Sequence, residues 1–244
     1  MRTSRLFSPV ELLQGAIVQL DAKQSHYLSK VLRLKTGEKV IFFDGVSHFD
    51  YQAVIIEIGK KVSVEIESKQ PNHKESPLDI AIYQALSKSE HIDLTLQKCT
   101  ELGVNSFTIF NSERTQNHLK SKVLEKKLKH WESVIQSACE QCGRSITPKI
   151  KFSANLNSVL EQTGTRQLYL LDFLGKPIQQ ALKNEDLNSV GILLGAEGGL
   201  SNSEIQLAEQ SGFKKIYLGS RVLRTETAAM TATALFQLLK GDLG

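Results

Sequence analysis

Two glycine-containing segments near the C-terminal end combine the residue types that hold a polar ligand. Residues 194–199 (LGAEGG) follow the apolar run 191–194, and residues 218–225 (LGSRVLRT) follow the run 215–218. Each segment precedes a stretch with helical periodicity, so each is expected to be a strand-to-helix loop. In an open α/β sheet such loops meet at the carboxyl ends of the strands, where backbone N–H groups and helix N-termini surround a ligand. The two loops are therefore predicted to form one binding site.

The motifs that are absent narrow the chemistry of this site. The chain has no Gly-x-Gly-x-x-Gly, no Gly-x-x-x-x-Gly-Lys-Ser/Thr and no Gly-x-Ser-x-Gly, which argues against the usual dinucleotide, ATP and serine-hydrolase sites. All six histidines precede residue 131, so the sequence places none of them near the glycine loops. Leu200, Leu218 and Leu223 stand among backbone polar groups, and this mixture suits a ligand such as an adenosine.

Composition indicates a cytoplasmic globular protein. The chain has 244 residues, of which 41% are hydrophobic, and no apolar run approaches the roughly 18 residues that span a bilayer. Its N-terminus lacks a signal-peptide core, so no membrane partner is expected. The three cysteines include a single Cys-x-x-Cys at 139–142, which predicts free thiols rather than a zinc site, and no metal is expected.

The net charge of +4 is unevenly distributed. Residues 1–152 hold 22 basic and 17 acidic side chains, whereas residues 153–244 hold 8 and 9. This placement suits a polyanion held by the N-terminal part while chemistry occurs in a neutral C-terminal part. A charge this small is equally well explained by solubility alone.

The elements that position the loops fall into two predicted parts. Short alternating runs separated by glycines predict a small β-barrel or sandwich, with one helix over 23–34. The polar segment 69–77, with two prolines, predicts a linker. Beyond it, strand-like and helix-like stretches alternate, as in a parallel sheet with crossover helices. The expected strands are 16–20, 39–44, 51–58, 61–66, 78–86, 107–110, 167–172, 191–194 and 215–218, and the expected later helices are 92–103, 123–142, 177–182 and 225–239.

Local signals support several helix ends. Ser201 and Glu204 have the spacing of a capping box, and Gly103 and Gly212 are expected to end helices in the left-handed conformation. The first half of the helix over 225–239 consists almost entirely of small side chains. We therefore expect another backbone to approach it closely.

The glycine loops also resemble a known signature. Residues 195–199 and 218–228 resemble the C-terminal motif of the RsmE family, which are 16S ribosomal RNA (uracil-N3)-methyltransferases of the SPOUT (trefoil-knot) superfamily. The family usually has proline where this chain has Ala196, so we expect a looser turn there. The resemblance covers nearly the whole chain and includes Arg2, Arg5-Leu-Phe7, His26 to Glu38, Lys88, Lys98 to Val104, Glu113-Arg114 and Glu140 to Arg144.

The resemblance implies an α/β fold with two domains. Residues 1–70 would form a PUA-like β-barrel that binds RNA, and residues 77–244 would form a SPOUT trefoil-knot domain with a parallel sheet. It further implies S-adenosylmethionine as cofactor, a homodimer with the active site at the subunit interface, and 16S ribosomal RNA or the assembled small subunit as partner. The reaction would be methylation of N3 of one specific uridine.

Roles for individual residues follow from the same resemblance. Arg221 and Arg224 would stabilise the uracil anion or a nearby phosphate, and Glu226 would orient an arginine or accept the proton. A glutamate at a helix N-terminus is favourable in any case, and Glu197 could serve only to order its loop. Cofactor contacts are expected from Leu171, Leu194, Gly195, Glu197, Gly198, Gly199, Leu218, Gly219, Ser220, Arg221, Val222, Leu223, Arg224 and Thr225, with Asp172 on the far side.

RNA contacts are expected from basic side chains that meet phosphates or stack on bases. The expected residues are Arg2, Arg5, Arg33, Lys35, Lys88, Arg114 and Arg144, with Lys120, Lys122, Lys126, Lys127 and Lys129 adding to the field. A lysine-rich helix face is also commonly just solvated.

Two other functions stay open: a SPOUT enzyme that acts on tRNA or on a ribose hydroxyl, and a non-catalytic ribosome-binding module.

Overall fold

The computed structural model describes residues 3–115, 118–119 and 121–244, except for the side chains of 121 and 122. Contacts within the chain divide it into two compact units. The first consists of Met1–Glu75 with Cys139–Thr147, and the second of Ser76–Ala138 with Pro148–Gly244. In the described part of the chain, no helix is long and apolar enough to cross a membrane.

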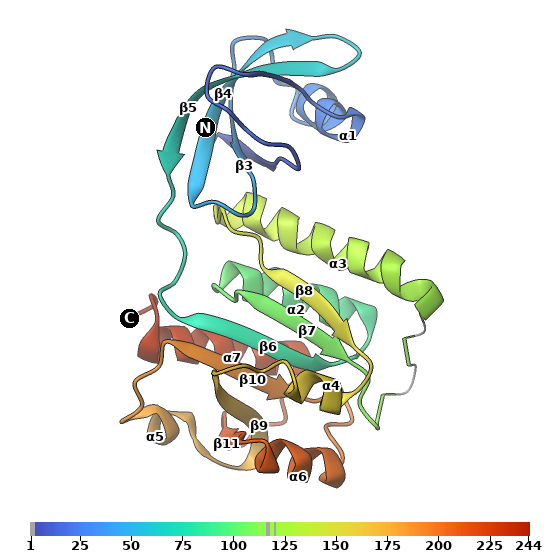
Figure 1. Ribbon diagram of the computed structural model, residues 1–244, viewed down its shortest axis with the longest axis vertical. Coiled ribbons are helices and arrows are strands. Elements are labelled where there is room, and N and C mark those ends of the chain that lie inside the picture. The colour runs from blue at the N-terminus through green and yellow to red at the C-terminus, as the bar shows by residue number, and fades with distance from the viewer. Residues whose placement is uncertain (1–2, 116–117, 120) are drawn as a thin grey trace. The chain divides into compact units, whose positions relative to one another are not determined.

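The N-terminal unit contains a five-stranded sheet in the order β1-β3-β4-β5-β2 (Figure 1). Its neighbours pair antiparallel except β1 and β3, which are parallel. The inward residues of these strands, among them Val40, Phe42, Ile55 and Val64, are fully buried in one core with Leu28. The strands are β1 (Ser4–Phe7), β2 (Ile17–Gln19), β3 (Lys39–Phe43), β4 (Phe49–Ile58) and β5 (Val62–Pro71).

The structure shortens the helix expected over 23–34 in this unit. Helix α1 (Ala22–His26) starts where the Asp21 side chain accepts a hydrogen bond from the Gln24 N–H, and a π-helical turn over Tyr27–Val31 follows it. The chain then leaves the helix at Arg33, whose φ is 55°. The predicted linker is also shorter, because β5 extends to Pro71 in pairing with β4. Strand β1 was not predicted.

The C-terminal unit is built on a six-stranded sheet in the order β11-β9-β10-β6-β7-β8, in which every neighbouring pair is parallel. The parallel sheet predicted from the alternation of elements is therefore confirmed. The edge strand β8 was not predicted, because its exposed lysines interrupt the apolar pattern. The strands are β6 (Asp79–Ala85), β7 (Ser106–Phe110), β8 (Lys149–Ser153), β9 (Gln167–Pro177), β10 (Ser189–Leu194) and β11 (Lys214–Tyr217).

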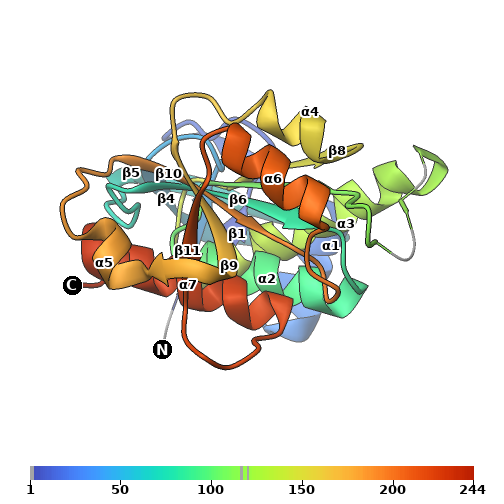
Figure 2. The ribbon, with the colours of Figure 1, turned by 90° about the horizontal axis from the view of Figure 1, so that it is seen from below.

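Helices cover both faces of this sheet. Figure 2 shows α2 and α7 on one face and α4 and α6 on the other. Helix α6 begins with the predicted capping box of Ser201 and Glu204, and Gly103 and Gly212 have the predicted positive φ, 91° and 93°. The short helix α4 was not predicted. The helices are α2 (Ser89–Glu101), α3 (Ser121–Cys142), α4 (Leu156–Leu160), α5 (Ile178–Leu182), α6 (Asn202–Gln210) and α7 (Thr225–Lys240).

The small-residue face of α7 packs directly against α2, as the sequence predicted. Ala229 and Ala232 are buried, and Thr233 points its hydroxyl at the Cys99 sulfur 3.7 Å away. Burial raises the pKa of the Cys99 thiol to about 12. All three cysteines are free thiols, as expected.

Strand β9 changes its pairing with β11 part-way along. Lys215 pairs with Leu170, but the next residue, Ile216, pairs with Lys176. Residues 171–175 are therefore left out of the ladder and are available to the ligand site. At Gly175 a β-carbon would lie 2.5 Å from the Ile216 carbonyl carbon, so only glycine allows the two backbones to pass this closely.

Candidate active site

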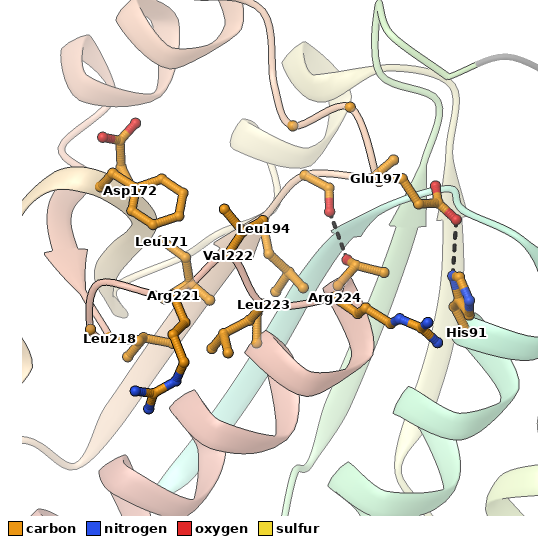
Figure 3. A pocket seen from close by; sticks show the side chains of 18 of the residues that line it. His91, Leu171, Asp172, Leu194, Glu197, Leu218, Arg221, Val222, Leu223 and Arg224 are labelled. Atoms are coloured by element: carbon orange, nitrogen blue, oxygen red, sulfur yellow. Dashed lines mark hydrogen bonds and ion pairs between the residues drawn. The ribbon is translucent and has the colours of Figure 1, made fainter.

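A cavity of about 760 Å³ opens where β9, β10 and β11 end in the C-terminal unit. It is lined by the two glycine loops, by residues 171–173 of β9 and by the start of α2 (Figure 3). All of the predicted cofactor residues line it except Ser220, which is exposed and outside the walls. The residues of the two predicted segments and of 171–172 that line the cavity are Leu171, Asp172, Leu194, Gly195, Ala196, Glu197, Gly198, Gly199, Leu218, Gly219, Arg221, Val222, Leu223, Arg224 and Thr225.

One hydrogen bond joins the two glycine loops at the bottom of this cavity. The buried Thr225 hydroxyl, at the first residue of α7, donates to the Gly195 carbonyl oxygen at 2.8 Å (Figure 3). The loop at 194–199 is itself a tight turn, in which the Gly199 N–H donates to the Ala196 oxygen at 2.9 Å. The turn therefore closes without the proline that the family usually has. A β-carbon on Gly195 would lie 2.6 to 2.8 Å from backbone atoms of Gly199 and Leu200, so glycine is required there.

The two predicted catalytic arginines point in different directions. Figure 3 shows Arg224 directed toward His91 and Glu197, whereas Arg221 extends away from them beside Leu218. Both side chains are exposed and line the cavity. The two arginines therefore face different parts of the site.

Glu226, the third predicted catalytic residue, is not a wall of the cavity. Its side chain is 6% exposed, and its Oε2 lies 3.8 Å from Nδ1 of His91. That oxygen has no hydrogen-bond partner among the described residues. Glu226 therefore faces His91 from inside the protein rather than a ligand in the cavity, and this placement does not support direct proton abstraction by its carboxylate.

His91 corrects the expectation that no histidine lies near the glycine loops. It stands in the first turn of α2 and lines the cavity, and its Nδ1 lies 2.9 Å from Oε1 of Glu197. Desolvation, the largest single effect, raises the pKa of Glu197, but hydrogen bonds from backbone N–H groups of Glu197 and Lys88 and from His91 together hold it below its usual value. Sequence distance concealed this pair, because 106 residues separate its members.

Other walls of the cavity were also missed from the sequence. Phe173 and Tyr217 stack edge to face with ring centroids 6.4 Å apart, and they reach the site because β9 changes register beside β11. No local motif signals that change. The missed wall residues are Glu90, His91, Phe173, Ile216, Tyr217 and Ala228, together with Lys88, which was expected to contact RNA.

Two family models match the chain. A family model for an RNA methyltransferase domain matches residues 74–237, which is more than half of the chain. The chain belongs to the RNA methyltransferase family. A second model, for an RNA methyltransferase PUA domain, matches residues 20–67.

Relatives of this methyltransferase match over its whole length. The ribosomal RNA small subunit methyltransferase E of Buchnera aphidicola subsp. Schizaphis graminum is 33% identical over 242 residues, which is 99% of this chain and 98% of the relative. A putative methyltransferase from Legionella pneumophila, solved in complex with the bound cofactor SAM, is 34% identical with a TM-score of 0.93, and each chain is covered completely. The ribosomal RNA small subunit methyltransferase E of Neisseria gonorrhoeae, solved with S-adenosyl methionine, is 30% identical with a TM-score of 0.89 over 100% of both chains. The predicted fold class, a SPOUT-type α/β domain with a PUA-like N-terminal domain, is confirmed.

The basic residues that were expected to bind RNA occupy different environments in the methyltransferase. Arg33 and Lys35 are exposed in the N-terminal unit. In the C-terminal unit, Lys88 lines the cavity, and the exposed Arg114 donates to the Gly198 oxygen at 2.9 Å. These four positions remain candidates for RNA contact.

Arg5 and Arg144 need a correction, because both are buried in ion pairs of the N-terminal unit. The Arg5 side chain is 6% exposed and lies 2.5 Å from Asp50, and the Arg144 side chain is 4% exposed and lies 2.6 Å from Glu75. Arg5 also donates to the backbone oxygens of Cys139 and Arg144, which fixes the segment Cys139–Thr147 to the N-terminal sheet. Their guanidinium groups already have protein partners, so the structure assigns them to stability rather than to phosphate contacts.

The described lysines of α3 lie in different environments. Lys129 pairs with Glu125 at 2.7 Å on the surface, and Lys127 donates to the Ser89 hydroxyl. Lys126 is exposed. The predictions for Arg2, Lys120 and the side chain of Lys122 fall outside the described residues.

Proposed function

We propose that this protein transfers the methyl group of S-adenosylmethionine to N3 of a specific uridine in 16S ribosomal RNA of the small ribosomal subunit, in the cytoplasm. The observation that carries the proposal is the cavity formed by the two joined glycine loops, with a basic side chain and an imidazole on one wall. The names and ligands of the relatives support the same reaction.

The cavity fits S-adenosylmethionine. Its volume of about 760 Å³ lies within the range of about 300 to 1,000 Å³ that is typical of small-molecule sites. Leu171, Leu194 and Leu223 offer apolar surface for the adenosine, while backbone groups of the loops can meet its polar edges. The carboxylates of Asp172 and Glu197 at the walls complement the two positive groups of the cofactor.

The bound cofactor supplies an electrophilic methyl group through its sulfonium, so the chain needs only to orient the reactants and manage a proton. Uracil N3 carries a hydrogen and becomes nucleophilic as it loses that hydrogen. Negative charge then develops on the carbonyl oxygens beside it. A cation held in a partly desolvated cavity stabilises such charge strongly, and Arg224, directed toward His91, is placed to do so (Figure 3).

N3 lies on the Watson–Crick edge of the base. The target uridine must therefore be unpaired, or turned out of its stack, when the enzyme acts. We propose that residues 1–70 hold the surrounding RNA, with contacts from Arg33 and Lys35, and that Lys88 and Arg114 of the domain 77–244 meet phosphates near the cavity. All four side chains are exposed.

We also propose that the enzyme works as a homodimer. In the C-terminal unit Val222 is 85% exposed, Leu174 is 86% exposed and Leu238 is 53% exposed. Large apolar side chains as exposed as these are available for contact with a partner chain. Val222 also lines the cavity, so a partner subunit on this surface would adjoin the bound reactants.

The experiment that tests the function compares small-subunit ribosomal RNA from cells with and without the gene. We expect one N3-methyluridine to disappear from the RNA, as read by mass spectrometry of nuclease fragments. Reverse transcription provides a second measurement, because an N3-methyl group blocks base pairing and stops the transcriptase. Incubation of the purified protein with naked RNA or with small subunits then identifies the substrate form.

Other outcomes would point to the other two functions. Loss of a tRNA or ribose methyl group, with unchanged ribosomal N3-methyluridine, would identify a different SPOUT activity. Absence of S-adenosylmethionine binding in a calorimetric titration would indicate a non-catalytic ribosome-binding module. Methylation that hardly responds to added salt would contradict the role given to the basic side chains.

A further inference from the structure

His91 combines three properties of an acid-base group. It is the one histidine among the described residues that line the cavity, its side chain is 15% exposed, and both of its ring nitrogens face carboxylates. It belongs to the first turn of α2, a helix whose inner face is buried and which packs on α7, so its backbone is held firmly. An imidazole titrates near neutral pH, which suits the uptake of a proton during a reaction.

The bond to Glu197 fixes which nitrogen of His91 carries the hydrogen. Nδ1 lies 2.9 Å from Oε1 of Glu197, and backbone N–H groups of Glu197 and Lys88 help to keep the pKa of that carboxyl below its usual value, against the effect of desolvation. An ionised carboxylate only accepts hydrogen bonds, so Nδ1 must donate. In the neutral imidazole the lone pair then lies on Nε2.

Nε2 is free to accept a proton. The carboxylate nearest to it is that of Glu90, at 3.7 Å, which is beyond hydrogen-bonding distance. The Glu90 side chain is 77% exposed, so solvent screens its charge. A uracil that reached Nε2 would therefore displace no hydrogen-bonded protein group.

Glu226 places a second carboxyl group beside the ring. Its Oε2 lies 3.8 Å from Nδ1, and its side chain is 6% exposed. A buried oxygen without a hydrogen-bond partner interacts strongly with a charge that appears beside it, because little water screens the two. Protonation of Nε2 would place an imidazolium beside the carboxyl groups of both Glu197 and Glu226.

We propose that His91 is the proton acceptor of the methyl transfer and that Glu197 and Glu226 position it and stabilise its charged form. This inference rests on the proposed function. The N3–H bond of uracil breaks and its proton passes to Nε2, while the electron pair left on N3 forms the new bond to the methyl carbon. The carbon–sulfur electron pair stays on sulfur, which becomes a neutral thioether, and the imidazolium later releases its proton to water.

The remaining charged groups around His91 are consistent with this step. Arg224 is directed toward it from the loop before α7 (Figure 3), and the Lys88 side chain lines the cavity one turn before it. These two cations lie on the cavity side, where the uracil oxygens gain negative charge. The carboxylates of Glu197 and Glu226 lie at Nδ1, where the positive charge of the imidazolium needs stabilisation.

A purely structural role for His91 makes a different prediction. If His91 only tethers Glu197 and its loop, its loss should weaken cofactor binding and leave the pH dependence of the chemical step unchanged. A proton acceptor should instead change the pH dependence and leave cofactor binding nearly intact. The two roles are therefore separable by measurement.

The test is the His91→Gln variant of the full-length protein in single-turnover methylation of small subunits at saturating S-adenosylmethionine. We expect the wild-type rate to rise with pH and then to level off, because only the neutral imidazole can accept a proton. The variant should be slower by about 10² to 10⁴-fold, and its rate should keep rising up to about pH 9, because N3 must then ionise without help. The dissociation constant of S-adenosylmethionine, measured by calorimetry, should change by less than about threefold.

The tautomer gives a readout that does not depend on activity. Nitrogen NMR of histidine-labelled protein, with the His91→Gln spectrum identifying the resonances, should show hydrogen on Nδ1 of the neutral ring. The matched control is His130→Gln. His130 is an exposed histidine that does not line the cavity, and its Nε2 lies 2.8 Å from Oδ2 of Asp93. This control should keep the wild-type rate and pH profile, and both variants should melt as cooperatively as the wild type.

Three results would overturn the inference. The first is a wild-type rate and pH profile for His91→Gln, and the second is hydrogen on Nε2 instead of Nδ1. The third is a loss of cofactor affinity of more than about tenfold with an unchanged pH profile, which would make His91 a tether. Failure of the proposed function looks different, because the wild-type protein itself would then form no N3-methyluridine.

Discussion

Replacement of Gly195 by alanine tests whether the tight turn of the first glycine loop forms the cofactor site. Gly195 directly follows β10, and its carbonyl oxygen accepts a hydrogen bond from the Thr225 hydroxyl at 2.8 Å. A β-carbon there would lie 2.6 Å from the Gly199 carbonyl carbon, 2.7 Å from its α-carbon and 2.8 Å from the Leu200 nitrogen. All three are backbone atoms, so no side-chain rotation relieves the clash and the turn must open.

The size of the effect follows from these contacts. Overpacking of a closely packed site typically costs about 1 to 3 kcal/mol, which in a chain of this length corresponds to a fall in melting temperature of roughly 2 to 12 °C. An opened turn would also move Glu197 and the backbone groups that meet the ligand. If the whole cost falls on the binding-competent loop, S-adenosylmethionine affinity drops by roughly 5 to 150-fold.

Differential scanning calorimetry and a calorimetric titration with S-adenosylmethionine measure the two quantities. The matched control is Gly198→Ala in the same loop, because its β-carbon would meet only the Arg114 side chain, at 3.7 Å. We expect Gly198→Ala to keep the wild-type melting temperature and to lose much less affinity. Unchanged melting and affinity in Gly195→Ala, or equal losses in the two variants, would refute the reasoning.

Three further predictions concern Arg224, Arg144 and Glu140. Arg224→Ala should slow methyl transfer by about 10² to 10³-fold with little change in cofactor affinity by calorimetry; an equal loss of both would make Arg224 a binding residue. Arg144→Met leaves the Glu75 carboxylate buried without its partner at 2.6 Å, and chemical denaturation should show the N-terminal unit destabilised by about 3 to 5 kcal/mol. The control, Lys39→Met, breaks an exposed ion pair and should cost less than about 1 kcal/mol. Burial raises the pKa of Glu140 above its ordinary value of 4.5, so the folded state binds the carboxyl proton more tightly than the unfolded state does. Protonation of Glu140 therefore stabilises the fold fully below pH 4.5, and this stabilisation is lost as the pH rises through the raised pKa. Glu140→Gln should therefore lose less stability than the wild type between about pH 4 and about pH 7 in thermal melts, and a parallel pH dependence of the two proteins would contradict this assignment.

The prediction of the glycine loops succeeded because its signals are local. A strand that ends in glycine and leads into a helix has a fixed geometry, so residues 194–199 and 218–225 could be assigned to one site without coordinates. The capping box at Ser201 and the left-handed glycines at 103 and 212 are local for the same reason. Hydrogen bonds within a few residues depend little on the rest of the fold.

The positive charge of a residue predicted its RNA contacts less well than turn sequences predicted the loops. Arg5 and Arg144 have the residue type and the motif of RNA-binding positions, yet the structure buries both against carboxylates. Their partners, Asp50 and Glu75, lie 45 and 69 residues away in sequence. A sequence shows that a side chain is charged, but only the packing around it decides whether that charge meets solvent.

The sequence by itself determined the fold class, the two glycine loops and most walls of the cavity, because strand and helix periodicity and turn chemistry act over short distances along the chain. The tertiary structure decided which polar groups share that cavity. It brought His91 to Glu197 across 106 residues and placed Glu226 behind the imidazole instead of in the cavity. These contacts depend on the strand order β11-β9-β10-β6, which no local pattern encodes, so the pairing of acid and base groups at the site had to come from the folded chain.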